Sequence, residues 1–326
     1  MITEVLDGVR SAGALVGRSL LSPPWSLRFD ESASMTLVAV VRGHAWVASG
    51  GGPPDGADGD ATIVRLGSGD VGIVTGPQPF TVTSERDCTT SPLWVQAAEG
   101  RCTDENGRAL NVEAIGLGTR TWGTALDAEH ALLTGTYVTG SRTADRLLAA
   151  LPRVLVIPAA SVRTGARDML DAVVPVVEPG QSGVIDRLLD LVLVGALRDW
   201  LAGHQDEAPG WHRATSDPVV APAIRAVHDA PERPWTVGAL ASLARVSRAA
   251  FARRFTELMG EPPISYLTSW RLCTAADLLV DTPDTVDVVA RKVGYSGAFS
   301  FSNAFTREYG QRPGSYRAQK QAGRAW

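Results

Sequence analysis

Two stretches of this 326-residue chain decide its fold: TVGALASLARVSRAAFARRFTELMGEPPISY at residues 236–266 and TVDVVARKVGYSGAFSFSNAFTREYGQRPGSY at residues 285–316. They repeat one unit. Thr236, Val237 and Ala241 recur 49 positions later, and beyond one inserted residue the matches continue at a separation of 50. The later matches are Phe251, Phe255, Gly260, Pro263 and Tyr266, which recur as Phe301, Phe305, Gly310, Pro313 and Tyr316. So many matches at a nearly constant spacing indicate a duplicated structural unit.

Each copy has the pattern of a helix-turn-helix, in which a short helix, a tight turn and a longer helix follow one another. The predicted helices are 237–244 and 247–259 in the first copy, and 286–292 and 298–309 in the second. Their starts carry side chains that suit an N-cap, namely Thr236, Ser247, Thr285 and Ser296. A connecting helix over 264–280 would hold the two copies at a fixed separation.

The paired phenylalanines lie four residues apart and mark the buried stripe of each longer helix. The residues left facing outward are Arg248, Ala249, Ala252 and Arg253 in the first copy and Ala298, Phe299, Ser302 and Asn303 in the second. Two such helices on one rigid chain suit successive major grooves of DNA, about 34 Å apart.

The segments VSRAAFARRFTELMGEPPISYLTSWRLCTAADLL (246–279) and VDVVARKVGYSGAFSFSNAFTREYGQRPGSYR (286–317) resemble the AraC/XylS class of transcription regulators. Further segments resemble the cupin-type sensor domain of one branch of that class. These are PPWSLRF (23–29), VVRGHAWV (40–47), GSGDVGIVTGPQPF (67–80) and LLAALPRVL (147–155). The resemblance implies binding to promoter DNA in response to an intracellular signal.

In the first copy, Arg253 is the strongest candidate for reading a base, because an arginine can contact guanine O6 and N7 together. The alternative is a solvated surface arginine. Arg248 is expected to touch a phosphate or a flanking base. Ala249 and Ala252 allow close approach and contact with a thymine methyl group, although helix propensity alone also explains them.

In the second copy, Asn303 stands at the position of Arg253 and can pair with adenine. Many relatives in the resembled class carry arginine there, so this motif is expected to read another base or to bind more weakly. Phe299 either contacts thymine methyl groups or packs inward. Arg307 is expected to clamp a phosphate. Gly297 replaces the usual capping serine, a role that Ser296 would take over.

The rest of the chain predicts an α+β protein with an N-terminal cupin-like β-sandwich or barrel and a C-terminal all-α domain with two helix-turn-helix motifs. Short apolar runs separated by Gly, Pro and Asp clusters predict strands, at 35–41, 45–48, 63–66 and 71–74. A helix with Val5, Val9, Ala12 and Val16 on one face is expected before them. The expected domains are 1–205 for sensing and dimerisation, 206–217 as a linker and 218–320 for DNA binding.

A longer helix is predicted over 184–201, with an apolar stripe that suits either its own sandwich or a second protomer. Charge is divided along the chain in a way that fits these roles. Residues 217–326 carry 14 Lys and Arg against 10 Asp and Glu, whereas residues 1–216 carry 17 against 25. An acidic regulatory part followed by a basic part is typical of nucleic-acid-binding regulators.

Composition excludes several other classes. The chain is 44% hydrophobic and 20% charged, as in ordinary soluble proteins. It lacks an apolar run of about 20 residues, and residues 1–18 lack the order of a signal peptide. Three scattered cysteines fit a reducing compartment. We therefore expect a cytoplasmic protein that does not contact a membrane.

The sensor part has candidate ligand-binding residues but not a complete metal site. Cupins often hold a metal with a His-x-His pair and a later histidine, and the resemblance implies the same positions here. Trp46 stands where the second histidine would, and Phe80 where the later one is frequent. We therefore predict no metal and no cofactor. His44, Trp46 and Trp94 are instead candidates to line an apolar effector cavity.

Cys88 and Cys102 are candidate redox-sensing residues. They lie 14 positions apart, and Arg86 and Arg101 are close to them in the chain, which favours the thiolate. One branch of the resembled class senses oxidants through cupin-domain thiols, so a reversible disulfide is one expectation. Two unrelated cysteines are the other. Cys273, in the connecting helix, is expected to pack.

These observations predict a transcription regulator, not an enzyme, because the motifs of phosphate loops, nucleophile elbows and zinc proteases do not occur. Its expected partners are double-stranded promoter DNA, a second copy of the chain, RNA polymerase, and a small-molecule or oxidant effector. A cupin-derived metalloenzyme fused to a DNA-binding tail is the alternative. An architectural DNA binder without signal input is a third reading.

Overall fold

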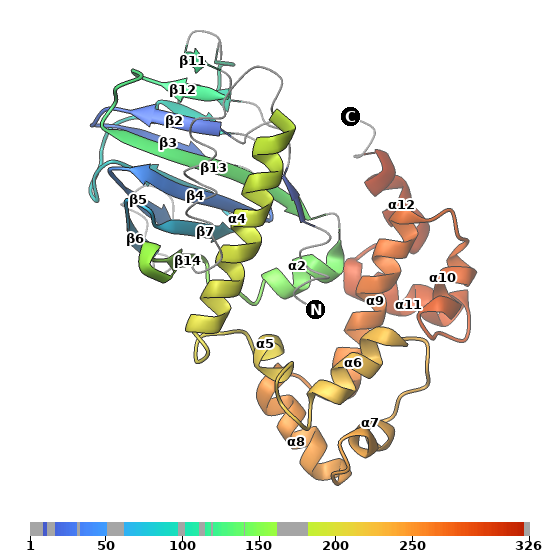
Figure 1. Ribbon diagram of the computed structural model, residues 1–326. Coiled ribbons are helices and arrows are strands. Elements are labelled where there is room, and N and C mark those ends of the chain that lie inside the picture. The colour runs from blue at the N-terminus through green and yellow to red at the C-terminus, as the bar shows by residue number, and fades with distance from the viewer. Residues whose placement is uncertain are drawn as a thin grey trace. The chain divides into compact units, whose positions relative to one another are not determined.

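The computed structural model describes residues 9–11, 17–30, 33–50, 62–96, 102–110, 115–118, 120–139, 141–161 and 182–322. The chain forms two compact units (Figure 1). The first unit contains Met1–Thr139 and Leu148–His204, and the second contains Gly140–Leu147 and Gln205–Trp326. The α+β fold class expected from the sequence, with a sheet-rich first part and a helical second part, is confirmed.

Two sheets build the first unit. Among the described residues, eight strands form one sheet, with the order β11-β12-β2-β13-β4-β7-β14 and with β1 also paired to β13. The strands are β1 (Val9–Ser11), β2 (Gly17–Leu21), β4 (Met35–Arg42), β7 (Val71–Thr75), β11 (Gly116–Gly118), β12 (Thr121–Gly123), β13 (His130–Thr139) and β14 (Val154–Ile157).

The second sheet has the order β10-β9-β3-β8-β5-β6 in the part of the chain that the structure describes. Its strands are β3 (Ser26–Phe29), β5 (His44–Ser49), β6 (Thr62–Gly67), β8 (Phe80–Thr83), β9 (Trp94–Gln96) and β10 (Cys102–Thr103). The four strands expected at 35–41, 45–48, 63–66 and 71–74 are present as β4, β5, β6 and β7, each extended by one or two residues.

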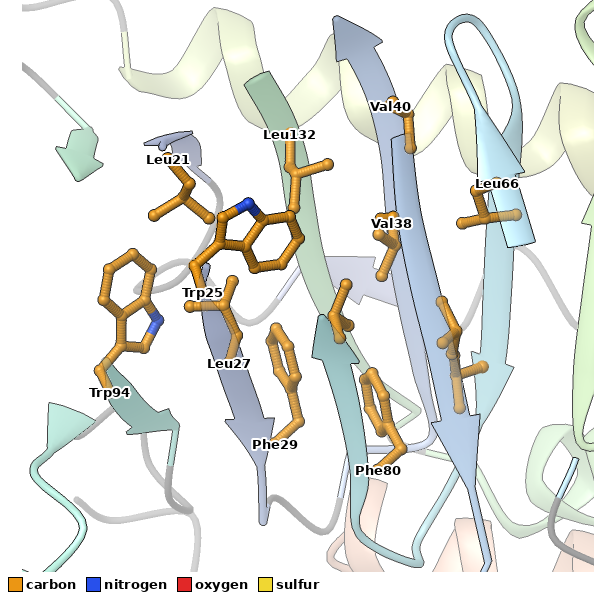
Figure 2. Packing of buried hydrophobic residues seen from close by; sticks show 14 residues of the cluster. Leu21, Trp25, Leu27, Phe29, Val38, Val40, Leu66, Phe80, Trp94 and Leu132 are labelled. Atoms are coloured by element: carbon orange, nitrogen blue, oxygen red, sulfur yellow. The ribbon is translucent and has the colours of Figure 1, made fainter. Parts of the chain in front are cut away.

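The core of this unit lies between the two sheets, which makes it a β-sandwich. Figure 2 shows Val38, Val40 and Leu132 of the first sheet beside Leu27 and Phe29 of the second. All five are at most 2% exposed. Phe29 and Phe80 stack with ring centroids 4.6 Å apart. Each fully buried side chain of this size contributes roughly 1.5–3 kcal/mol, so burial of this cluster stabilises the unit.

A long helix packs on the sandwich. Helix α4 (Ser182–Gly203) contacts β1 and β14 and buries Leu193, Ala196 and Trp200. The helix predicted over 184–201 is therefore present and packs on its own sandwich, while Leu191 is 52% exposed. Among the described residues, no helix is both long enough and apolar enough to span a membrane.

The helix expected near the N-terminus is not observed at residues 9–11, which the structure describes as a strand. Val9 begins strand β1, which pairs antiparallel with β13. β-branched valine suits a strand, and this pairing outweighs the weak helical periodicity. Val5, Ala12 and Val16 lie outside the described residues.

The second unit is helical. Its elements are α2 (Arg142–Leu148), whose last residue lies beyond the unit's boundary, and then α5 (Gly210–Ala214), α6 (Ala221–Asp229), α7 (Val237–Leu243), α8 (Arg248–Met259), α9 (Pro263–Asp281), α10 (Val286–Lys292), α11 (Ala298–Tyr309) and α12 (Pro313–Ala322). The stretch 206–217, expected to be a linker, contains α5, which packs on α8 and buries Trp211. Its polar sequence, with Pro209 and Gly210 together, conceals this contact.

The duplicated pattern forms two helix-turn-helix motifs, α7–α8 and α10–α11. The turns differ by one residue, because Arg245 at φ +56° and Gly294 at φ +82° are 49 positions apart while α8 and α11 start 50 apart. Both longer helices end at a left-handed glycine, Gly260 at φ +74° and Gly310 at φ +71°. Glycine tolerates this conformation best, which explains why it occurs in both copies.

Candidate nucleic-acid interface

Helix α8 of the first motif is held in place by its buried face and its N-cap. Phe251 is fully buried and Phe255 is 1% exposed, and the Phe255 ring meets Tyr266 of α9 edge-on at 5.6 Å. Ser247 caps the helix, since its hydroxyl accepts from the Ala250 backbone N–H at 3.2 Å. Thr236 does the same for α7 through Ala239. These contacts leave one face of α8 directed to solvent.

The outward face of α8 carries the residues expected to contact DNA. Arg248 and Ala249 are exposed, and Ala252 is half-buried. The Arg253 side chain is 76% exposed, and its Nε lies 3.8 Å from a carboxylate oxygen of Glu257. An exposed pair of this kind is weak and easily exchanged for a stronger partner. Arg253 is therefore available to a base or a phosphate.

The neighbouring Arg254 has a structural role that was not predicted from the sequence. Its guanidinium donates through Nε and Nη2 to one oxygen of Asp217, at 2.9 and 2.7 Å. The other Asp217 oxygen accepts from the backbone N–H groups of Val219 and Val220 just before α6. Burial opposes ionisation of this carboxyl, but these donors outweigh it and hold the pKa of Asp217 below its usual value.

Helix α11 of the second motif is held in the same way on its buried side, by Phe301 and Phe305. Its start differs. The N-cap is Gly297, which has no side chain to offer, and the Ala298 backbone N–H instead donates to Asp287 of α10 at 3.3 Å. Ser296, expected to take over as the cap, lies 3.5 Å from Ser300 through its hydroxyl. Asp287 of the neighbouring helix α10 therefore caps α11 in place of a serine.

The outward face of α11 is less basic than that of α8. Phe299 is 83% exposed, so of the two expectations for it, outward exposure is the one observed. Asn303 and Arg307 are exposed, and Ala298 and Ser302 are half-buried. Phosphate contacts dominate affinity for DNA, and base contacts add specificity. Because Ala298 and Asn303 stand where α8 has Arg248 and Arg253, α11 supplies less charge for binding.

In the first unit, the expected effector residue His44 lies beside another histidine. The rings of His44 and His130 are 4.8 Å apart, and the Trp25 indole N–H donates to His130 Nδ1 at 2.8 Å. His130 is 5% exposed, and burial and then His44 lower its pKa, which favours the neutral ring that accepts from Trp25. Gly43, at φ +81°, is required here because a Cβ would lie 2.2 Å from His130 Cδ2.

The other two expected pocket residues, Trp46 and Trp94, do not share one face of the second sheet. Trp46 lies on the half-buried side of β5, opposite to Ala45 and Val47, which face the core. Trp94 is 8% exposed and is part of the core itself (Figure 2). Alternation along a strand puts neighbouring residues on opposite faces of the sheet. Trp46 and Trp94 therefore lie on opposite faces of this sheet.

The two candidate redox residues are also apart. Cys88 lies next to Trp25, whose carbonyl oxygen is 3.6 Å from its sulfur. Cys102 pairs with Gln96, which in turn pairs with Phe29. Two strand spacings and the four residues from Phe29 to Trp25 put the Cα atoms of Cys102 and Trp25, the residue beside Cys88, on the order of 15 Å apart. A disulfide needs about 7 Å or less, so these segments would have to move to form one. Cys273 is buried, as expected.

Comparisons with known proteins agree with this architecture. The family described as Cupin matches residues 1–202, and the family described as Helix-turn-helix domain matches residues 240–319. A Streptomyces lividans protein described as an AraC-like transcription regulator is 30% identical over 97% of each chain. One from Streptomyces antibioticus with the same description is 29% identical over the same shares.

Among solved structures, the DNA-binding domain of AdpA in complex with a target DNA is similar. It is 34% identical, with a TM-score of 0.32, and the match covers 33% of this chain and 97% of that one.

Proposed function

Because this chain belongs to the AraC-like, DNA-binding transcription regulators, we propose that α8 and α11 read promoter DNA under the control of the cupin unit. In this proposal Arg253 reads guanine, Asn303 reads adenine and Arg307 clamps a phosphate. Arg248, Ala249, Ala252, Ala298, Phe299 and Ser302 complete the contact surface. The regulated promoter, RNA polymerase and a second copy of the chain are the proposed macromolecular partners, in the cytoplasm.

The observation that carries this proposal is the division of each longer helix into two faces. One face is buried through two phenylalanines, and the opposite face exposes polar, small or aromatic side chains without strong internal partners. In helix-turn-helix proteins it is this second helix that enters the major groove. Arg254 is hydrogen-bonded to Asp217. It is therefore a structural residue, unlike Arg253.

The test is binding of the full chain to its own upstream region by footprinting, followed by titrations at several salt concentrations. Replacing Arg307 by alanine should weaken binding to all sequences about equally and reduce the salt slope by about 1. Replacing Asn303 by alanine should cost less than replacing Arg253, because an asparagine contact carries no charge. Equal affinity for promoter and random DNA would contradict the proposal and favour an architectural role.

For the signal, we propose oxidation of thiols in the cupin unit. Cys88 is half-buried against the Trp25 carbonyl, and Cys102 is half-buried at the end of the sandwich core. Since the two sulfurs are far apart, a bond between them would require β9 and β10 or the segment 84–93 to shift, and such a shift is what a switch needs.

The test is a gel-shift series with diamide or hypochlorite on the wild-type chain, Cys88→Ser and Cys102→Ser, with Cys273→Ser as the control. A disulfide switch requires both cupin-unit variants to lose the response and the control to keep it. If both variants respond like the wild type, the thiol switch is excluded. A small molecule bound beside His44 and Trp46 is then the proposed signal.

We further propose that the chain dimerises through the first unit. The support is Leu191, an apolar side chain of α4 that is 52% exposed, whereas Val192, Leu193 and Ala196 of the same helix are buried. Sedimentation of Leu191→Lys beside the wild type tests this proposal. A charge at the centre of an interface should convert a dimer into a monomer, whereas an unchanged sedimentation coefficient would remove α4 from the interface.

A further inference from the structure

Helix α2 belongs to the DNA-binding unit, although strands of the cupin unit flank it in the chain. The segment Gly140–Leu147 forms part of the second compact unit. Strand β13 ends at Thr139 just before it, and β14 begins at Val154 just after the helix. This short helix of the second unit is therefore connected at both ends, through the chain, to strands of the same sheet.

The start of α2 is held by an acidic residue of α9. One oxygen of Asp277 accepts from the Arg142 backbone N–H at 2.7 Å, and the other accepts from the Ser141 hydroxyl at 2.7 Å. A carboxylate at this place satisfies donors that a helix start leaves without partners. Burial raises the pKa of the Asp277 carboxyl, and these donors work against that effect.

Two arginines one turn apart on α2 each cover a tyrosine. The Arg142 guanidinium lies 5.9 Å from the Tyr316 ring centre, and its Nε donates to the Tyr316 hydroxyl at 3.0 Å. Arg146 lies 5.0 Å from the centre of the Tyr266 ring and forms an ion pair with Glu261. Cations over aromatic faces are attracted by the ring, and partial desolvation strengthens this attraction.

These two tyrosines occupy the same position in the two copies of the repeat, 50 residues apart. Each one packs edge-on against a phenylalanine of the adjacent longer helix. Tyr266 meets Phe255 at 5.6 Å, and Tyr316 meets Phe305 at 5.3 Å. The contacts of α2 thus lead to equivalent points under α8 and α11, one in each motif.

We propose that α2 is a clasp that sets the orientation of the two helix-turn-helix motifs relative to each other. Arg142, Arg146 and Asp277 act as positioning residues in it, since each works through another side chain and not through DNA. Because α2 is tethered to the strands on either side, a rearrangement of the cupin sheet would act on both motifs at once. The proposal rests on the two-motif reading of DNA proposed above.

The test uses the full chain and a duplex that the wild type selects from a random-sequence library. Two further duplexes carry one base pair more or one less between the half-sites, which turns one half-site by about 35°. The wild type should bind the shifted duplexes about tenfold more weakly or worse, because a misplaced base contact costs about 5- to 150-fold.

The variant Arg142→Ala/Arg146→Ala should tolerate the shift, with a penalty of about twofold or less, while its affinity for the selected duplex falls about two- to thirtyfold. The variant Arg142→Lys/Arg146→Lys keeps a cation over each ring and should recover most of the spacing penalty. Arg225→Ala, which removes an exposed arginine of α6, is the control and should behave like the wild type.

A double alanine variant with the wild-type spacing penalty overturns the clasp, and so does one that loses affinity equally on all three duplexes. If the wild type binds all three duplexes equally well, the proposal that both motifs contact DNA bases is overturned instead. Failure of that proposal can therefore be told apart from failure of the clasp. Should the double variant lose its helical circular dichroism, Asp277→Asn supplies the same test. It frees the start of α2 and keeps both arginines.

Discussion

Arg254 of α8 donates two hydrogen bonds to a single carboxylate oxygen of Asp217, while the adjacent Arg253 faces solvent with a weak pair to Glu257. These two neighbouring arginines of one helix therefore have different roles. One ties the longer helix to the start of α6, and the other is available to a ligand. The difference predicts separable effects of replacing them.

Replacing Arg253 by alanine should cost about 1–3 kcal/mol on the cognate site and relax specificity at one base position. Its thermal unfolding should match that of the wild type, because the side chain is 76% exposed. Arg254→Ala should lower the unfolding temperature, since it leaves the buried Asp217 carboxylate without its cation. Binding titrations and thermal scans on both variants check this. An unchanged operator preference in Arg253→Ala would remove that residue from base reading.

Replacing Phe299 by alanine should lower affinity for the cognate duplex about fivefold and leave stability within about 0.5 kcal/mol, since its ring is 83% exposed. The matched variant is Phe301→Ala, two residues further along the same helix. Phe301 is fully buried, so this change should cost about 3–5 kcal/mol of stability. Urea unfolding and gel shifts separate the two effects. Unchanged DNA affinity of Phe299→Ala would mean that the ring lies outside the interface.

Replacing Gly43 by alanine should destabilise the cupin unit more than replacing Gly107. Both have positive φ, +81° and +78°, so each alanine bears about 1–2 kcal/mol of left-handed strain. Only at Gly43 would the new Cβ also meet His130, which is buried and bonded to Trp25. We expect roughly 1–3 kcal/mol more there. Tryptophan fluorescence during urea unfolding measures both, and equal losses would show that His130 moves aside freely.

Acid should destabilise the DNA-binding unit through His228. Burial and the nearby Arg146 lower the pKa of His228 to about 3, and its ring stacks on Trp270 and shares a hydrogen bond with the Tyr266 hydroxyl. The unfolded chain takes up this proton near pH 6.5, so stability is unaffected above that pH and falls as the pH drops toward 3.

The loss through His228 should reach about 3 kcal/mol between pH 6.5 and 4. His228→Phe removes the titration and should lose about that much less stability over the same range. His204→Phe, a ring stacked on Trp200 in the other unit, is the control. Urea unfolding followed by helical circular dichroism gives the comparison. The same acid sensitivity in wild type and His228→Phe would assign the effect to other groups.

The sequence by itself determined the double helix-turn-helix. Its helices match the predicted bounds to within a residue or two, and Thr236, Ser247 and Thr285 cap their helices as expected. These features are local, because an N-cap, a glycine C-cap and a phenylalanine pair at four-residue spacing act within one or two turns. Because the pattern occurs in two copies, each of these inferences was supported at two places in the chain.

Tertiary structure alone decided which distant segments meet. The sequence carries no sign that Asp217 ties down Arg254, that Asp287 caps α11, or that Asp277 holds α2 across about 135 residues of chain. It also suggested that Cys88 and Cys102 could be neighbours, whereas both are free cysteines and Cys102 lies two strands away from β3. Such contacts depend on how whole elements pack, and a single sequence records only the residue types that make them feasible.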